Sequence, residues 1–458
     1  MSVAAPVQSN VAAPVQSNVA APAQPEVAAP ARSNASAPVR LSIVVLSRHR
    51  PGLLALCLTA LSQQDHPEYE VILVADPASV DTRPDLRIKR IAFDLPNVSA
   101  ARNIGLGAAA GEVVAFIDDD ALALPGWARR IAAPFADPGV IAAAGFTRGP
   151  DGLGWQVRAE RLRPSGATVP VQVAEETALP PRDGCPVSTI GTNCAFRRHA
   201  LLAVGGFDPA FAYHLDESDV NMRMARTFPE ALTAIVPGAE VVHGIAAGPM
   251  RQAWGVPRDL TAVGHAHVTF ARRHGGPLPP VEAIQRKRLL RHMVAGRLDP
   301  FALTPLLRGL REGRARAAAQ PLPEPPRPLP DAAPGFLPLR PAPAAPAGLR
   351  LFSGWHWQAA RLRRSAAAAV ARGDRAAVLL LTPTFVPHRL GLRPGGWWEQ
   401  HGGLWGGMKG GMGDSPPDPR FRRRAAAAAA FRAAMTRRLG DFLQPATCPT
   451  CRKGHICD

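Results

Sequence analysis

Short apolar runs alternate with helical patterns along the first part of the chain. The runs are rich in β-branched residues and predict buried strands over residues 41–46, 70–76, 88–93, 112–120 and 140–146. Apolar residues at helical spacing predict helices over residues 51–64, 99–110 and 127–135, the second with Ser99 as a suitable N-cap. Strands that alternate with helices predict an α/β fold whose central sheet is mostly parallel, with right-handed crossovers.

This alternation is interrupted over residues 150–186, where the pattern is irregular. Farther along, strands are predicted over residues 187–196, 232–236 and 240–243, and helices over residues 199–204, 217–228 and 257–274. Residues 281–319 predict one or two helices that are basic on one side and apolar on the other. A strand over residues 376–381 and a Gly/Trp-rich run over 395–405 indicate a smaller folded unit near the C-terminus.

Proline and alanine separate folded from extended parts of the 458-residue chain. The sequence VAAPVQSN occurs twice over residues 3–18, and decaying copies follow, each with a proline that blocks helix and sheet. A second Pro/Ala-rich stretch follows the basic helices. The predicted organisation is a disordered tail over 1–40, a main α/β domain over 41–275, a basic helical extension over 276–319, a linker over 320–348, and a small C-terminal unit with disordered parts over 349–458.

The net charge of +17 bears on the choice of partners. Nucleic acid, an anionic membrane and phosphate-bearing substrates all fit a basic chain, but so does an Arg-rich composition without functional meaning. No nucleic-acid-binding motif accompanies the charge, so a nucleic-acid partner is not expected. In residues 281–319, nine Lys/Arg face three acids, which favours a bundle helix with a solvated basic face over a peripheral contact with an anionic membrane.

Six cysteines are too few and too scattered for a disulfide framework. Cys448, Cys451, His455 and Cys457 are of zinc-ligand types, but the group is short and terminal. The sequence contains no run of about 18 apolar residues and no secretory signal. We therefore expect a reduced, cytoplasmic protein, with the inner face of the membrane as the place of any peripheral contact.

Three adjacent carboxylates, Asp118, Asp119 and Asp120, follow the apolar run that begins at Val113. Ligands bind at the carboxyl edge of open α/β sheets, and three unpaired carboxylates at that edge would repel one another. A divalent cation such as Mg²⁺ or Mn²⁺ removes this repulsion and is the usual partner of carboxylates in phosphate chemistry. A solvated acidic turn explains the triplet equally well at this point.

The acidic strand end is one of several sequence blocks spread over residues 41–275. They are Asn97–Gly105 with Gly111 and Phe116–Asp120, Gly191–Arg198, Gly205–Asp208, Asp216–Asp219 with Arg223, and Val242–His243. In content and order, these blocks resemble family 2 glycosyltransferases, which have the GT-A fold, a Rossmann-like α/β fold with flanking helices. The resemblance implies an inverting, hexosyltransferase-like enzyme of polysaccharide biosynthesis. Its donor would be a nucleotide-diphosphate sugar and its acceptor a carbohydrate or a glycolipid.

The resemblance also assigns roles to the strand end, which reads as the family's DXD motif. It implies that Asp120 binds Mn²⁺ or Mg²⁺, that Asp118 lies near the donor ribose and the metal, and that Asp119 supports both. His243 would complete the metal shell as a neutral imidazole. The metal would neutralise the diphosphate as the glycosidic bond breaks.

Further donor contacts follow from the same resemblance. Asp76 ends the second strand, where the family has its base-binding aspartate, although the usual second acid before it is replaced by alanine. Ser47 and Arg48 correspond to the nucleotide-contacting turn after the first strand. Arg102 and Asn103 fit a donor-binding role, or else they cap and brace the helix over 99–110.

A single displacement needs a base to accept the proton of the acceptor hydroxyl. The family supplies it from a Glu-Asp-x-Asp block, and this chain has Asp216-Glu217-Ser218-Asp219, with the two acid types exchanged. Alignment puts Glu217 in the place of the base, and Asp216 is the alternative. The helix dipole also favours acids in a first helical turn without any catalytic role. Arg223 is expected to brace this helix.

Two other functions stay open. A sugar nucleotidyltransferase would need a glycine-rich, basic loop after the first strand, and Ser47–Gly52 holds one glycine. A non-catalytic carbohydrate-binding protein with the same fold would not need to retain the acids and the histidine of the site. Trp397, Trp398 and Trp405 form either a sugar-stacking surface or the small core of the C-terminal unit.

Overall fold

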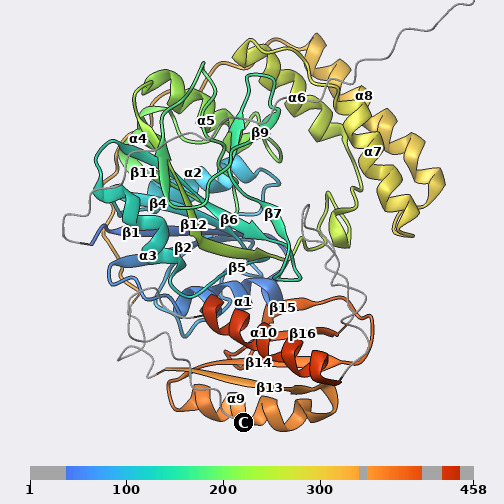
Figure 1. Cartoon of the computed structure of the whole chain (residues 1–458). Helices are drawn as coiled ribbons and strands as arrows, with labels where there is room; N and C mark the ends of the chain where they lie inside the picture. Colours follow the sequence, from blue (N-terminus) through green and yellow to red (C-terminus); the bar gives the residue numbers. More distant parts are fainter. Residues whose placement is uncertain (1–37, 340–347, 405–424, 444–458) are drawn as a thin grey trace, which may run out of the picture.

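The computed structural model describes residues 38–339, 348–404 and 425–443. Figure 1 shows a large central sheet covered by helices, a group of helices at one edge, and a second, smaller sheet next to the first. Within these ranges, no helix is both long enough and apolar enough to cross a bilayer. Cys448, Cys451, His455, Cys457 and Trp405 lie outside the described residues.

Ten strands form the central sheet within the described residues, in the order β10-β12-β6-β11-β4-β1-β2-β3, with β5 and β7 paired at its side. The pairs β4–β1, β1–β2, β2–β3 and β12–β6 are parallel, whereas β11 runs antiparallel to both of its neighbours. The strands span Leu41–Ser47 (β1), Tyr69–Ala75 (β2), Lys89–Ala92 (β3), Val113–Asp118 (β4), Ala121–Ala123 (β5), Val140–Arg148 (β6), Trp155–Val157 (β7), Thr177–Leu179 (β10), Cys194–Arg197 (β11) and Leu232–His243 (β12).

Helices cover both faces of this sheet, which explains the continuous apolar runs of its strands. On β1, Ile43 and Val45 pack against one layer of helices, and Val44 and Leu46 pack against the other. The first layer contains α1 (Pro51–Ser62) and α3 (Trp127–Ala132), and the second contains α2 (Val98–Ala108), α4 (Arg198–Ala203) and α5 (Asp216–Thr227). The predicted α/β fold class is therefore confirmed.

Local details differ from the sequence prediction where side-chain partners decide them. Asn97, and not Ser99, caps α2, because the Asn97 carboxamide accepts a hydrogen bond from the Ala100 backbone N–H at 2.9 Å. The Ser99 hydroxyl is buried and donates to the Phe211 carbonyl instead. The two strands predicted over 232–236 and 240–243 are one strand, β12, whose pairing with β6 shifts register between Val236 and Val241.

The irregular stretch over 150–186 contains short strands rather than helices. In addition to β7 and β10, Glu160–Leu162 (β8) and Thr168–Pro170 (β9) form a two-stranded sheet of their own. Beyond β12, three helices span Thr261–His274 (α6), Val281–Val294 (α7) and Leu303–Ala319 (α8). Figure 1 shows α7 and α8 side by side at the edge of the molecule.

Residues 320–339 contain no helix or strand, yet they pack along the main domain. The Leu329 N–H donates to the Leu202 carbonyl at 2.9 Å, and the Leu339 N–H donates to the Tyr69 carbonyl at 2.9 Å. Asp331 forms an ion pair with Arg198 at 2.6 Å. This segment therefore packs on the main domain along its path from α4 to the start of β2.

The smaller sheet has the order β13-β14-β16-β15. Its elements span Leu349–Trp355 (β13), Arg375–Thr382 (β14), Arg389–Leu392 (β15), Trp398–Gly403 (β16), Ala359–Ala371 (α9) and Ala425–Leu443 (α10). Trp398 is fully buried and belongs to the core of this unit rather than to a sugar-stacking surface. Hydrogen bonds from Leu390 N–H to the Pro150 carbonyl (3.1 Å) and from the Gln63 carboxamide to the Gly396 carbonyl (2.7 Å) connect the smaller unit to the main domain.

Candidate functional site

The predicted site residues of the strands meet at one edge of the central sheet. Because β1, β2 and β4 are parallel and in register, their carboxyl ends place Ser47, Asp76 and Asp118 at the same edge. This is the edge at which open α/β sheets bind ligands. The sequence alone placed each residue at a strand end, and the parallel pairing brings those ends together.

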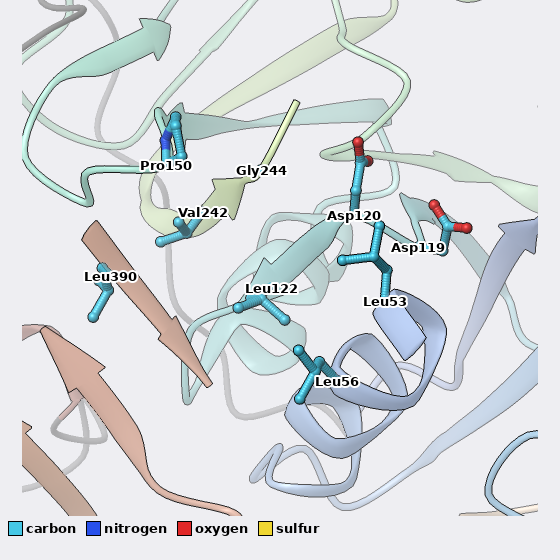
Figure 2. Close-up of a pocket in the computed structure, with 9 residues that line it drawn as sticks. All are labelled: Leu53, Leu56, Asp119, Asp120, Leu122, Pro150, Val242, Gly244 and Leu390. Carbon is cyan, nitrogen blue, oxygen red and sulfur yellow. The ribbon is translucent and has the colours of Figure 1, made fainter. Parts of the chain in front are cut away.

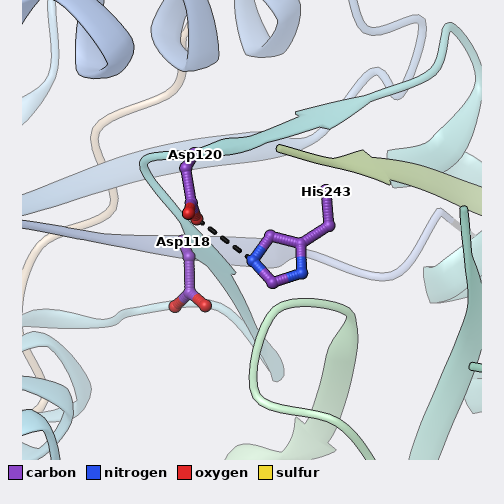
Figure 3. Close-up of side chains that lie close together, drawn as sticks. All are labelled: Asp118, Asp120 and His243. Atoms are coloured by element: carbon purple, nitrogen blue, oxygen red, sulfur yellow. Dashed lines mark ion pairs between the residues drawn. The ribbon is translucent and has the colours of Figure 1, made fainter. Parts of the chain in front are cut away.

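Asp118, Asp120 and His243 form the candidate metal centre. Their ligand atoms all lie within 4.8 Å of one another, and among the described residues this is the one such group of three or more. The antiparallel pairing of β12 with β5 sets His243 opposite Ala121, one residue beyond the acidic triplet. Figure 3 shows the imidazole of His243 next to the carboxylates of Asp118 and Asp120.

The hydrogen bonding of His243 suits a metal ligand. Its Nδ1 lies 3.0 Å from the Gln156 Oε1, which only accepts hydrogen bonds, so Nδ1 carries a proton, and in a neutral imidazole Nε2 would then keep the lone pair that a metal binds. Nε2 lies 3.2 Å from Asp120 Oδ1, and neither buried atom has a hydrogen-bond partner among the described residues. The two carboxylates supply oxygen ligands, which suit Mn²⁺ and Mg²⁺, and the His243 imidazole would supply a third ligand.

The second oxygen of Asp120 is held by the segment that follows β12. Arg251 Nη2 and the Ala246 N–H both donate to Asp120 Oδ2 at 2.8 Å, and Arg50 Nη1 lies 3.6 Å from the same atom. Burial acts to raise the pKa of Asp120, but the interactions with His243, Arg50 and Arg251 outweigh it, and the pKa lies below its usual range. Asp120 is thus ionised, as a metal ligand requires.

Asp119 points away from this centre and is completely buried. The Ser47 hydroxyl donates to its Oδ2 at 2.7 Å, and Arg50 reaches its two oxygens at 2.5 and 3.0 Å. Burial raises the pKa of Asp119 to about 7, although Arg50 and Ser47 lower it. The hydrogen bond between Ser47 and Asp119 therefore connects the end of β1 to the end of β4.

Asp76 lies at the end of β2 and is fully buried. The backbone N–H of His49 donates to its Oδ1 at 2.5 Å. Burial acts to raise the pKa of Asp76, but this hydrogen bond and the nearby polar groups of Ser79 and His49 outweigh it, and the pKa is lowered. Arg48 turns outward and donates to Asp94 Oδ1 at 2.7 Å. The turn after β1 is thereby held between the ends of β2 and β3.

Arg102 links the strand end to α5. It is buried, forms an ion pair with Asp216, and lies 3.7 Å from Asp118 Oδ1 and 3.9 Å from Glu217 Oε2. Gly191 leaves room for it, because a Cβ at that position would overlap the guanidinium. One arginine thus positions the acids of both predicted halves of the site.

Asn103, the neighbour of Arg102, turns to the protein interior. Its carboxamide donates to the Phe207 carbonyl at 2.6 Å and accepts from the Phe207 N–H at 2.8 Å. This pair of hydrogen bonds fastens α2 to the turn before α5. Asn103 therefore braces α2, which is the second of the two roles that the sequence suggested for it.

Glu217 lies in the first turn of α5, with its Oε2 3.9 Å from Arg102 Nη1. Burial raises the pKa of Glu217, and the nearby charge of Asp118 adds to the effect, whereas Arg102 opposes it. A carboxylate with a raised pKa is a stronger base. Asp216 is less available, because its carboxylate is engaged by Arg102.

The last acid of this block, Asp219, belongs to the interior. It accepts from Arg223 Nε at 2.8 Å, and His274 Nε2 lies 3.0 Å away. Arg223 also donates to the Gly206 carbonyl at 2.7 Å. Arg223 therefore braces α5 against the turn before it.

A small apolar cavity of about 100 Å³ lies on the other side of the strand end. Its lining comes from α1, β5, β12 and the smaller sheet: Leu53, Leu56, Asp119, Asp120, Leu122, Pro150, Val242, Gly244 and Leu390. Figure 2 shows the carboxylates of Asp119 and Asp120 pointing away from these apolar side chains. The cavity is thus a packing gap between the two sheets rather than part of the polar site.

Three contributors to the site were missed by sequence reasoning. Arg50 stands in the predicted turn Ser47–Gly52, where its basic neighbours gave a weak signal. Gln156 and Arg251 lie in segments without any pattern, 87 residues before His243 and 131 residues after Asp120. No local signal could have identified them, because only the fold brings them to their partners.

The family model described as Glycosyl transferase family 2 matches residues 42–204. No curated protein sequence matches the chain significantly. Glu217 and His243 lie beyond the matched residues, so their roles rest on the geometry and on the motif blocks.

Several solved structures are similar in part. The mannosyltransferase PcManGT from Pyrobaculum calidifontis, in complex with GDP-Man and Mn²⁺, is 22% identical, with 63% of this chain and 77% of that chain covered and a TM-score of 0.36. GalNAc-T7 with UDP, GalNAc and Mn²⁺ is 15% identical, with 52% and 47% covered and a TM-score of 0.40. S. aureus TarS 1-349 with UDP is 18% identical, with 56% and 72% covered and a TM-score of 0.35.

The order of the strands, the acidic strand end and the family match agree with one another. The resemblance seen in the sequence blocks is confirmed, and so is the GT-A type of α/β fold. Residues 42–204 form a glycosyltransferase domain of family 2.

Proposed function

We propose that this protein transfers a hexosyl group from a nucleotide-diphosphate sugar to an acceptor hydroxyl, with inversion at the anomeric carbon. The observation that carries the proposal is the convergence of Asp118, Asp120 and His243 at the carboxyl edge of a glycosyltransferase sheet. These three residues would hold Mn²⁺ or Mg²⁺. When bound, the ion would neutralise the diphosphate leaving group as the glycosidic bond breaks.

The residues around the ion would bind the rest of the donor. Asp76, at the end of β2, is ionised and suits the N–H groups of a nucleobase. Ser47 and Arg48 lie in the turn beside it, and Asp118 is partly exposed toward the same edge, next to the expected ribose. Arg102 and Asn103 act on the donor indirectly, since they hold α2 and the acids in place.

Glu217 is the proposed general base. Its carboxylate would accept the proton of the acceptor hydroxyl while the acceptor oxygen bonds to the anomeric carbon and the bond to the diphosphate breaks. Arg102 holds Glu217 near the strand end and leaves Asp216 engaged in an ion pair. A base on the face opposite the leaving group produces inversion.

A panel of nucleotide-diphosphate sugars with Mn²⁺ tests the donor half of this proposal. We expect one donor to bind and to be hydrolysed slowly, and we expect Asp120→Ala to abolish both. If no donor is bound or hydrolysed and Asp120→Ala changes nothing, the proposed activity is wrong.

A Glu217→Gln variant tests the acceptor half. Glutamine keeps the shape of the side chain but cannot take up a proton, so donor binding should persist while transfer falls by about 10²–10⁴-fold. An Asp216→Asn variant is the matched comparison. If Glu217→Gln keeps its transfer and Asp216→Asn loses it, the base is Asp216.

We further propose a carbohydrate or glycolipid acceptor, as in polysaccharide biosynthesis, and a cytoplasmic protein with peripheral membrane contact. The support for these assignments is the glycosyltransferase domain together with the basic helical extension.

A further inference from the structure

The helix α7 has one buried face and one face without a protein partner. Val281, Gln285 and Leu289 recur at helical spacing and are buried, with Val281 and Leu289 in the apolar core shared with α6 and α8. The opposite face is exposed, yet it carries large apolar side chains, among them Ile284 and Val294. A surface helix that is apolar on its solvent side marks an interaction surface.

The exposed apolar residues are gathered at the end of the helix pair α7–α8. Val294, at the end of α7, is 92% exposed, and Phe301, in the turn before α8, is 89% exposed. Leu290 lies one turn before Val294 and is also exposed. Figure 1 shows this end of α7 and α8 at the periphery, away from the central sheet.

Basic residues are interleaved with these apolar ones. Arg286, Lys287 and Arg291 are exposed on the same side of α7, and none of them forms an ion pair with a carboxylate of the described residues. Of the neighbouring acids, Glu282 is paired with Arg311, and Asp299 accepts a hydrogen bond from the Phe301 N–H at 2.8 Å. Protruding apolar side chains flanked by bases are typical of helices that lie in the interface of an anionic bilayer.

We propose that the exposed face of α7 and the turn to α8, with Ile284, Leu290, Val294, Phe301, Arg286, Lys287 and Arg291, dock on an anionic lipid membrane. Val294 and Phe301 enter the boundary between headgroups and acyl chains, and the bases contact lipid phosphates. This docking rests on the peripheral membrane contact proposed above and specifies its surface, but it does not depend on the proposed sugar transfer, so the docking and the transfer can each fail without the other.

Charge and shape disfavour the other occupants. A second copy of the chain would bring the same bases against this face, and like charges would repel. Residues 405–424 of the chain contain five Lys/Arg and two Asp, so they are also basic. A nucleic-acid backbone would satisfy the bases but offers no apolar phase for Val294 and Phe301.

Residues of α7 and of the turn after it contact the segment over residues 246–255, which holds Asp120. Arg288 of α7 donates to the Gly255 carbonyl at 2.6 Å, and the guanidinium of Arg297 lies 5.1 Å from the centre of the Trp254 ring. Arg251 of the same segment donates to Asp120. Docking would therefore place the candidate site next to the lipid surface.

Co-sedimentation of the full chain with vesicles tests this proposal. We expect binding to vesicles of phosphatidylcholine with phosphatidylglycerol and little binding to phosphatidylcholine alone. The double variant V294S/F301S should bind at least about tenfold more weakly, because it removes the apolar insertion. The triple variant R286Q/K287Q/R291Q should bind on the order of a hundredfold more weakly and lose most of its dependence on salt.

L95S is the matched control, because Leu95 is 65% exposed on a different part of the surface. It should bind the anionic vesicles as strongly as the unchanged chain. The proposal is overturned if the anionic vesicles are not bound, if both vesicle types bind equally, or if V294S/F301S binds like the unchanged chain. It is also overturned if, without lipid, the unchanged chain is a dimer and V294S/F301S is a monomer, since the face would then be a self-interface.

Discussion

Two acidic clusters lie on opposite sides of Arg102, and each contains one completely buried carboxylate. At the end of β4 this residue is Asp119, which has Arg50 as its ion-pair partner and Ser47 as a further donor. Burial raises its pKa to about 7, and the charges of the two neighbouring aspartates add to the rise.

On α5 the buried carboxylate is Asp219, and its surroundings have the opposite effect. Arg223, Arg273 and His274 all lie within 3.3 Å of its oxygens. Burial again acts to raise the pKa, but the hydrogen bond from His274 and the two arginine charges outweigh it, and the pKa of Asp219 lies below its usual range.

The difference between Asp119 and Asp219 distinguishes a structural ion-pair cluster from a candidate cation-binding site. A buried carboxylate stays ionised where cationic donors outnumber it, as at Asp219. At the strand end, Asp119 and Asp120 share Arg50, and Asp120 also has Arg251. Asp118 lies 3.7 Å from Arg102 and shares it with Asp216 and Glu217, so five carboxylates face three guanidiniums. A cluster with more acid than base gains from a further cation, which is the physical basis of the proposed metal site.

The strongest test of this contrast is Asp120→Asn. The substitution removes a ligand charge at the strand end, so transfer and Mn²⁺ binding should fall by about a thousandfold, equivalent to about 4 kcal/mol. Donor assays and titration calorimetry with Mn²⁺ measure the two effects. Asp85→Asn, in an exposed ion pair with Arg83, is the control and should change neither. Unchanged Mn²⁺ affinity in Asp120→Asn would remove the metal centre from this edge.

The second test compares the two buried acids directly. Asp219→Asn leaves Arg223 without its carboxylate, removes one of the two carboxylates around Arg273, and should lower the free energy of unfolding by about 3–5 kcal/mol. Asp119→Asn should lower it by about 1 kcal/mol, because the native carboxyl has a pKa near neutrality and is already partly protonated. Urea unfolding at neutral pH measures both. Equal losses would mean that the number of cationic partners does not decide the difference.

The α5 side should also be the more sensitive to acid. His214 and His267 lie in contact at 3.3 Å, and burial lowers the pKa of His214 to about 3 and that of His267 to about 4. Since the unfolded values are near 6.5, the unfolded chain binds more protons below that pH, and stability is lost as the pH falls from about 6.5 to about 4.

His267→Gln removes one of these groups and tests the acid sensitivity. The slope of unfolding free energy against pH should become shallower in this interval, by about 1–2 kcal/mol over the whole range. Urea unfolding at a series of pH values measures it. An unchanged slope would show that the histidine pair is not the acid-labile element.

The smallest expected effect concerns Arg251. Its guanidinium binds Asp120 Oδ2 and so competes with any cation there. Arg251→Ala should strengthen Mn²⁺ binding without donor by about fivefold, equivalent to about 1 kcal/mol. Titration calorimetry measures the change. Weaker Mn²⁺ binding in this variant would mean that Arg251 supports the ion and does not compete with it.

The sequence by itself determined the buried strands β1, β2, β3, β4 and β6 and the family of the domain. Short continuous apolar runs between helical patterns are typical of strands that are buried on both faces of a parallel sheet. The order of the sequence blocks around Asp118–Asp120 indicated the family, and the match to the family model confirms it. The predicted roles of Asp76, Glu217 and His243 also came from the sequence, and they stay predictions for experiment to test.

Only the tertiary structure decided which side chains cap, pack against or form hydrogen bonds with one another. Asn97 rather than Ser99 caps α2, and Trp398 lies in a core, because long-range packing selects among side chains that suit either role. Gln156 and Arg251 reach His243 and Asp120 across 87 and 131 residues of sequence. The local pattern of apolar residues determines which side of a segment is buried. The hydrogen-bond partner of a polar atom is determined by the distant segment that the tertiary fold places next to it.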